Sequence, residues 1–387
     1  MRFRVQDIVP YLPIDARGNP ISPSERLDRV VRTAVLAEKL GYDSFAVGER
    51  HFGDFLSSAP TVLLGALAQA TERILLSTGV TVLSLLDPVR VAEDYATVDL
   101  LSSGRLELVI GKGNEVEHFP IFGLEIEHQY GYFTENFELL RRLLSEEGVT
   151  WSGTYRSALH GVTTLPRPYD GAFRIWHGSA SSPDSVDLAA RWGDPVFSSH
   201  SLQPTQNYRK LLDHYRERWE FYGRDPAGAW VGAGSGGLFL AATDAEAIES
   251  YRPAYEAAAA RASLRDHGPN TLGKVSSFAT LAEAVEVGTA LVGSSQSVAE
   301  KIIRFHDQLG HDVQSISVSH LIPYEEQAEV LRQFAEEVVP LVNAELGTDL
   351  WSERDPDRAR GFTAPDQSGA RRLHRAPDPA SVTTTPA

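Results

Sequence analysis

The sequence predicts an α/β fold, a (β/α)8 TIM barrel with insertions at its C-terminal mouth. Short β-branched runs alternate with amphipathic helical stretches, which is typical of a parallel sheet covered by helices. The cycle repeats close to eight times over roughly 340 residues. An open doubly wound sheet has the same alternation, but the number of repeats and their extent favour the closed barrel.

The first repeat carries the clearest signals. Residues 3–9 alternate as a strand, and a helix then begins at Ser22, with Pro23 in its first turn, and ends at Gly41. Similar signals mark the later elements. The other expected strands are 44–47, 74–82, 106–110, 174–176, 196–198 and 313–318. The other expected helices are 61–70, 87–103, 133–144, 184–192, 205–222, 297–309 and 325–339, and a hairpin turns at 151–155.

We assign residues 1–345 to one barrel domain. Residues 243–290 break the rhythm with an alanine-rich helix, and we expect an inserted excursion over the barrel mouth. Residues 349–387 are rich in proline and charge and have little apolar periodicity. This segment is predicted to be a disordered tail.

Composition excludes several classes of function. The net charge of −16 argues against a nucleic-acid partner, since such a protein must neutralise phosphates. The absence of cysteine excludes disulfides, thiolate nucleophiles and cysteine-based metal sites. No apolar run is long enough to span a membrane, and the first residues do not resemble a signal peptide. We therefore expect a cytoplasmic protein.

The loop of residues 178–183 is the most informative candidate site. Active sites of parallel barrels lie at the C-terminal ends of the strands, where this loop follows the fifth strand. Its small residues lead into a helix that begins with proline, so backbone N–H groups and serine hydroxyls are available to hold a phosphate monoester. An ordinary serine cap on a barrel helix is the alternative.

Lys112 is a second candidate for the same phosphate. It lies between Gly111 and Gly113 at the end of the fourth strand, where glycines allow close approach of the backbone. A solvated lysine in a turn would give the same pattern.

Glu49, Arg50 and His51 place three ionisable side chains at the end of the second strand. His51 could serve as a general acid or base. No metal is predicted, because the sequence has no His-x-His or His-Glu-x-x-His spacing. It also has neither a P-loop nor a Gly-x-Ser-x-Gly motif.

A series of segments along the chain resembles the bacterial luciferase-like monooxygenase family of flavin-dependent (β/α)8 barrels. The segments occur in the family's order and cover roughly residues 1–340. They include Gly48-Glu49-Arg50-His51-Phe52, Asp87-Pro88-Val89-Arg90, Ser103-Gly104-Arg105, Gly111-Lys112-Gly113, Phe122-Gly123, Gly178-Ser179-Ala180-Ser181-Ser182-Pro183 and Leu291-Val292-Gly293-Ser294-Ser295.

This resemblance implies an FMN site at the barrel mouth. The FMN phosphate would rest on the 178–183 loop beside Lys112, and the flavin ring would lie against Gly79-Val80, where the family often has a non-proline cis peptide bond. The implied cofactor-binding residues are Gly79, Val80, Lys112, Gly113, Gly178, Ser179, Ala180, Ser182 and Ser199.

The sequence departs from the family at one catalytic position. The usual loop reads Glu-His-His-Phe, and here Arg50 replaces the first histidine. Arginine does not act as a base near neutral pH. We therefore expect His51 to carry the acid–base role, with Glu49 and Arg50 as the other candidate catalytic residues.

The resemblance implies a two-component monooxygenase that uses reduced FMN from a separate reductase and O2 to oxygenate a small organic substrate. A homodimer is expected on the same ground. Two alternatives stay open. One is a deazaflavin-dependent oxidoreductase that transfers hydride on the same fold, and the other is a flavin-binding protein without catalytic activity.

Overall fold

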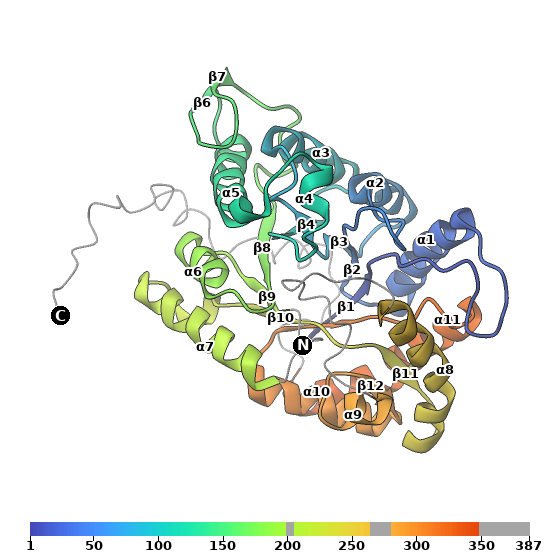
Figure 1. Cartoon of the computed structure of the whole chain (residues 1–387). Coiled ribbons are helices and arrows are strands. Elements are labelled where there is room, and N and C mark those ends of the chain that lie inside the picture. The colour runs from blue at the N-terminus through green and yellow to red at the C-terminus, as the bar shows by residue number, and fades with distance from the viewer. Residues whose placement is uncertain (199–204, 264–279, 348–387) are drawn as a thin grey trace.

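Eight parallel strands close into the predicted barrel (Figure 1). The computed structural model describes residues 1–198, 205–263 and 280–347. Each strand pairs with its neighbours in parallel, and β13 pairs with β1 to close the ring. The strands in spatial order are β1 (Arg2–Asp7), β2 (Ser44–Val47), β3 (Leu75–Thr78), β5 (Leu106–Gly111), β8 (Arg174–Ser179), β9 (Val196–Ser198), β10 (Val231–Ala233) and β13 (Val313–Ile316).

Helices surround this ring, and their caps are those that the sequence predicts. Ser22 Oγ accepts a hydrogen bond from the Glu25 N–H at 3.1 Å, and Gly41 ends the helix with a φ of 81°. Around the barrel follow α1 (Pro23–Leu40), α2 (Pro60–Ala70), α3 (Pro88–Leu101), α5 (Gln129–Ser145), α6 (Pro183–Trp192), α7 (Thr205–Phe221), α10 (Ser295–Leu309) and α11 (Tyr324–Gln333).

Shorter elements decorate the barrel. A hairpin of β6 (Val149–Trp151) and β7 (Leu159–Val162) projects beyond α5, as predicted. A second pair, β11 (Leu238–Leu240) and β12 (Leu291–Gly293), is parallel. The remaining elements are α4 (His118–Ile121), η1 (Ile126–His128), η2 (Pro226–Gly228), α8 (Asp244–Ser263), α9 (Leu281–Glu286), η3 (Phe334–Val338) and α12 (Val339–Leu346).

Two expectations about strands need correction. The expected strand 74–82 is two strands, because the chain breaks at Gly79 and resumes as β4 (Thr81–Val82) beside β5. The seventh strand, β10 (Val231–Ala233), was not predicted, because its central glycine weakens the strand signal.

The domain boundaries stay a prediction. The segment 243–290 contains α8 and α9, and Tyr251 of α8 stacks on Phe239 of β11 with ring centroids 5.6 Å apart. The expected tail, 349–387, lies outside the described residues. None of the described helices combines the length and the apolar character needed to cross a bilayer.

Candidate functional site at the barrel mouth

A cavity of about 220 Å³ opens at the C-terminal ends of the strands. It receives residues from four of the loops singled out in the sequence. The predicted site residues that line it are Glu49, Arg50, Gly79, Val80, Lys112, Gly113, Gly178, Ser179, Ala180 and Ser182. His51 does not line it, and Ser199 lies outside the described residues.

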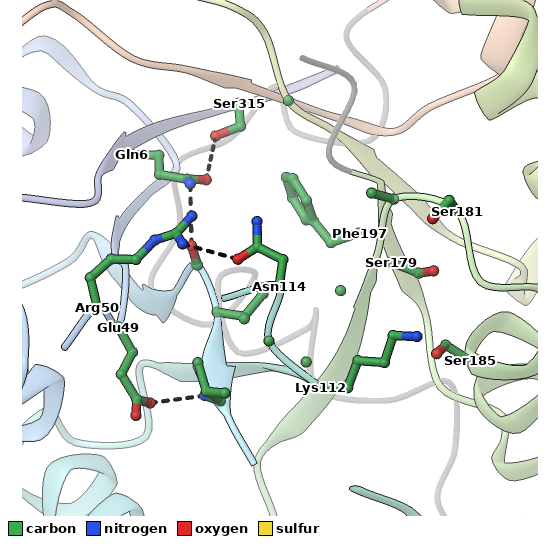
Figure 2. A pocket seen from close by; sticks show the side chains of 18 of the residues that line it. Gln6, Glu49, Arg50, Lys112, Asn114, Ser179, Ser181, Ser185, Phe197 and Ser315 are labelled. Atoms are coloured by element: carbon green, nitrogen blue, oxygen red, sulfur yellow. Dashed lines mark hydrogen bonds between the residues drawn. The ribbon is translucent and has the colours of Figure 1, made fainter. Parts of the chain in front are cut away.

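One rim of the cavity is built from serines at the start of α6. Ser182 Oγ caps the helix by accepting from the Ser185 N–H at 3.4 Å, and the Ser182 N–H donates to Ser179 Oγ at 3.2 Å. Ser181 and Ser185 also border the cavity (Figure 2). Hydroxyls and the positive end of a helix dipole thus gather in one place.

Lys112 faces this rim from the end of β5. Its ammonium group extends toward Ser179 and Ser185 (Figure 2). Its backbone carbonyl accepts hydrogen bonds from Ser84 Oγ at 2.7 Å and from Gln129 Nε2 at 3.0 Å, so the loop is held from outside the cavity. No carboxylate of the described residues pairs with the ammonium group, which leaves this charge available to an anion.

Val80 lines the cavity. The Gly79–Val80 peptide bond is cis, as expected. A Cβ at Gly178 would lie 2.5 Å from Val80 Cγ1, and a Cβ at Gly111 would lie 2.8 Å from Val80 Cγ2. These two glycines therefore make room for the valine. For Gly111, this packing role differs from the expected one, which was close approach of the backbone to a phosphate.

Glu49 is a buried carboxylate with both oxygens engaged. Its Oε2 accepts from the Val82 N–H at 2.9 Å, and its Oε1 lies 2.8 Å from His51 Nε2. His51 packs behind it against Phe122, with ring centroids 4.7 Å apart. His51 therefore reaches the cavity through its neighbours, by its contact with Glu49 and by an edge-to-face contact with the lining residue His118, whose ring centroid lies 5.5 Å away.

Arg50 belongs to a second polar network. Its Nη1 donates to Asn114 Oδ1 at 2.9 Å (Figure 2). The same Nη1 lies 2.5 Å from Glu115 Oε1. The other oxygen of Glu115 lies 2.6 Å from His118 Nε2. Arg50 thus presents a paired guanidinium group at the cavity edge, where the family pattern has a histidine.

The floor of the cavity contains polar residues that the sequence analysis missed. Arg4, Gln6 and Ser315 border it, and Gln6 Oε1 accepts from Arg4 Nη2 at 2.7 Å. The missed signal is the alternation of β1, where polar residues at positions 2, 4 and 6 share one face. In a closed barrel that face points inward.

The described residues contain no cluster of three His, Asp or Glu side chains suited to a metal ion. The pKa of another histidine near the mouth is strongly displaced. Burial lowers the pKa of His320 to about 4, and the nearby Arg26 and Arg29 act in the same direction while Asp7 opposes them.

Comparison with known proteins identifies relatives of the whole barrel. The family described as luciferase-like monooxygenase matches residues 8–312. The crystal structure of the monooxygenase RslO1 from Streptomyces bottropensis superposes with a TM-score of 0.77 at 28% identity, covering 88% of this chain and 99% of that one.

Curated relatives include enzymes of two kinds. The F420-dependent glucose-6-phosphate dehydrogenase of Beutenbergia cavernae is 38% identical over 171 residues, 41% of this chain and 49% of that protein. The alkanal monooxygenase alpha chain of Photorhabdus laumondii is 27% identical over 205 residues, 53% of this chain and 56% of that protein. The chain therefore matches about half the length of these relatives.

Proposed function

The chain belongs to the luciferase-like monooxygenase family, a family of flavin- and F420-dependent oxidoreductases, and from this premise we propose that it is an FMN-dependent two-component monooxygenase. It would use reduced FMN from a separate reductase and O2 to oxygenate a small organic substrate.

The observation that carries this proposal is the paired arrangement of Lys112 and the serine rim. The hydroxyls of Ser179 and Ser182, the start of α6 and an ammonium group that pairs with no carboxylate of the described residues form a donor set suited to a phosphate monoester. The distal phosphate of FMN has this chemistry. The donor set therefore fits the cofactor.

The remaining lining residues suit a flat ring system. Val80 offers an apolar surface beside the serine rim, and Phe197, which belongs to the apolar cluster that Val80 packs against, also borders the cavity. FMN bound there would supply the two-electron chemistry with O2. Glu49 and Arg50 would orient polar groups of the bound molecules, and the enclosing side chains would exclude water.

A second candidate is an F420-dependent oxidoreductase that transfers hydride without oxygen. The 38% identity to a dehydrogenase that uses F420 favours it. A phosphate rim serves both coenzymes, so the rim does not distinguish them. We prefer FMN because the Glu49-Arg50-His51-Phe52 loop is closer to the monooxygenase pattern.

The proposal also includes partners. A reductase must deliver reduced FMN, because the sequence has no nicotinamide-binding fingerprint. We also propose a homodimer, which light scattering of the purified protein would test.

The test is equilibrium titration of the purified protein with FMN, riboflavin and F420, followed by oxygen uptake with photoreduced FMN and a panel of organic substrates. We expect FMN to bind at least about tenfold tighter than riboflavin, from charge-assisted bonds to its phosphate. Oxygen consumption should yield oxygenated product. Preferential binding of F420 would instead establish the hydride-transfer candidate. Tight FMN binding without turnover on the panel would favour the non-catalytic alternative.

A further inference from the structure

Arg4 is a buried cation at the floor of the cavity, and it forms no ion pair with any residue that the structure describes. Its side chain is on the inner face of β1, and only 3% of the residue is exposed. Its guanidinium group donates to three neutral oxygens, and two of these bonds are long. The acceptors are Gln6 Oε1 at 2.7 Å, Ser315 Oγ at 3.4 Å and Ser77 Oγ at 3.5 Å.

The other arginines inside the barrel differ from Arg4 in having a carboxylate. Arg2 Nη1 lies 3.3 Å from Glu107 Oε1, and Arg174 Nη1 lies 3.9 Å from the same oxygen. Glu107 forms no ion pair with Arg4, and its negative charge favours the charged form of Arg4 only through a longer-range electrostatic attraction. Burial lowers the pKa of Arg4 to about 9, which shows that the local environment disfavours its charge.

The surroundings of Arg4 hold it in one orientation. The guanidinium carbon lies 3.8 Å from the centre of the Phe197 ring. Gln6 is fixed by its own bond from Nε2 to the Gly79 carbonyl at 3.3 Å and by accepting from Ser315 Oγ at 3.3 Å (Figure 2). The amide oxygen of Gln6 therefore faces Arg4, and the planar guanidinium group of Arg4 is held in a fixed orientation beside the cavity.

A buried charge without a counter-charge costs free energy, and such groups concentrate at functional sites. We propose that Arg4, with Gln6 and Ser315, forms a site for a planar conjugated anion, an oxyanion or ring nitrogen anion that supplies the missing negative charge. The anion site is inferred from Arg4 and its contacts alone. Only the identity of its natural ligand rests on the proposed function. That ligand is either the anionic ring of the reduced cofactor or a substrate that binds as a phenolate or enolate.

The first experiment uses the protein without flavin. 4-Nitrophenol is the probe, because its phenolate absorbs differently from the phenol, and 4-nitroanisole is the neutral control of the same shape. We expect the wild-type protein to bind the phenolate selectively, Arg4→Met to lose about tenfold or more of that affinity, and Arg4→Lys to retain part of it. Binding of 4-nitroanisole should be the same in all three proteins.

Thermal unfolding separates this role from a structural one. If Arg4 serves a ligand, Arg4→Met removes an unpaired buried charge and should leave the Tm unchanged or raised. Arg2→Met is the matched control on the same strand, and it should lower the Tm because it leaves Glu107 short of a partner. A large fall in Tm for Arg4→Met, or phenolate binding no better than anisole binding in the wild type, would overturn the proposal.

Two further measurements distinguish the natural ligands. For a cofactor anion, Arg4→Met should lower the midpoint potential of bound FMN by about 30 mV for each tenfold loss in relative affinity for the reduced form, and FMN should displace nitrophenolate. For a substrate anion, the potential should stay constant and nitrophenolate should bind alongside FMN. Failure of FMN to bind while phenolate selectivity persists would refute the proposed function and leave the anion site standing.

Discussion

Val80 and Gly178 fit against each other across the barrel mouth with no room for another carbon. A Cβ at Gly178 would lie 2.5 Å from Val80 Cγ1 and 3.3 Å from the Ile110 carbonyl oxygen. The valine can therefore stand beside the serine rim only because the last inward-facing residue of β8 is a glycine. The positions of Val80 and of Gly178, the first residue of the 178–183 loop, are thus coupled by packing.

Gly178→Ala should destabilise the protein by about 1–3 kcal/mol, because overpacking forces Val80 or the strand to move. Val80→Ala in the same chain should recover part of this loss, since the side chain in closest contact is then gone. Urea unfolding of both single variants and the double variant gives the coupling free energy. Additive losses would show that Val80 is not the group that excludes the methyl.

The order of the barrel and the location of the mouth could be predicted because they depend on local signals. Caps such as Ser22 and Gly41 and the alternation of strands with helices lie within short stretches of sequence. The strand β10 could not be found in this way. A Cβ at Gly232 would overlap the Phe197 ring, so glycine is required there by a tertiary contact that weakens the local strand signal.

The candidate site was predictable in its loops but not in its side-chain directions. The sequence places Glu49, Arg50 and His51 in one loop, but it does not specify that Glu49 faces the cavity while His51 packs behind it. Arg4 was missed for a related reason. The alternation of β1 puts its polar residues on one face, but only the closed barrel determines that this face points inward.

Lys112→Ala should weaken FMN binding by about tenfold or more, because a charge-assisted hydrogen bond to the phosphate is lost. Riboflavin, which has no phosphate, should bind the variant and the wild type equally. Fluorescence quenching of both flavins measures the two affinities. Lys112→Arg is the matched control and should retain most of the difference between FMN and riboflavin. Equal losses for both flavins would place Lys112 in a packing role.

His320 should make folding stability depend on pH. Burial lowers the pKa of this residue from 6.5 to about 4, so between these values the unfolded chain holds a proton that the folded chain does not. Stability is then fully present above about pH 6.5 and falls by up to about 3 kcal/mol as the pH drops to about 4. His320→Gln should remove this dependence.

The comparison must be made between variant and wild type at each pH. Burial raises the pKa of Asp99 to about 6, so Asp99 stabilises the folded chain as the pH falls through the same range and partly hides the effect of His320. Urea unfolding at several pH values gives the difference between the two proteins. A difference that does not change with pH would contradict the displaced pKa of His320.

His51→Ala should spare FMN binding, within about twofold, and change the rate at which oxygen reoxidises bound reduced FMN by about tenfold or more. The reason is that His51 does not line the cavity but holds Oε1 of Glu49, whose other oxygen is fixed by the Val82 N–H. Without the histidine, the carboxylate loses one of its two anchors and its position at the cavity edge changes. His51→Gln offers a replacement donor and should restore part of the rate. Phe122→Leu removes the ring that packs on His51 without touching the hydrogen bond, so an equal effect from that variant would reduce His51 to a packing residue.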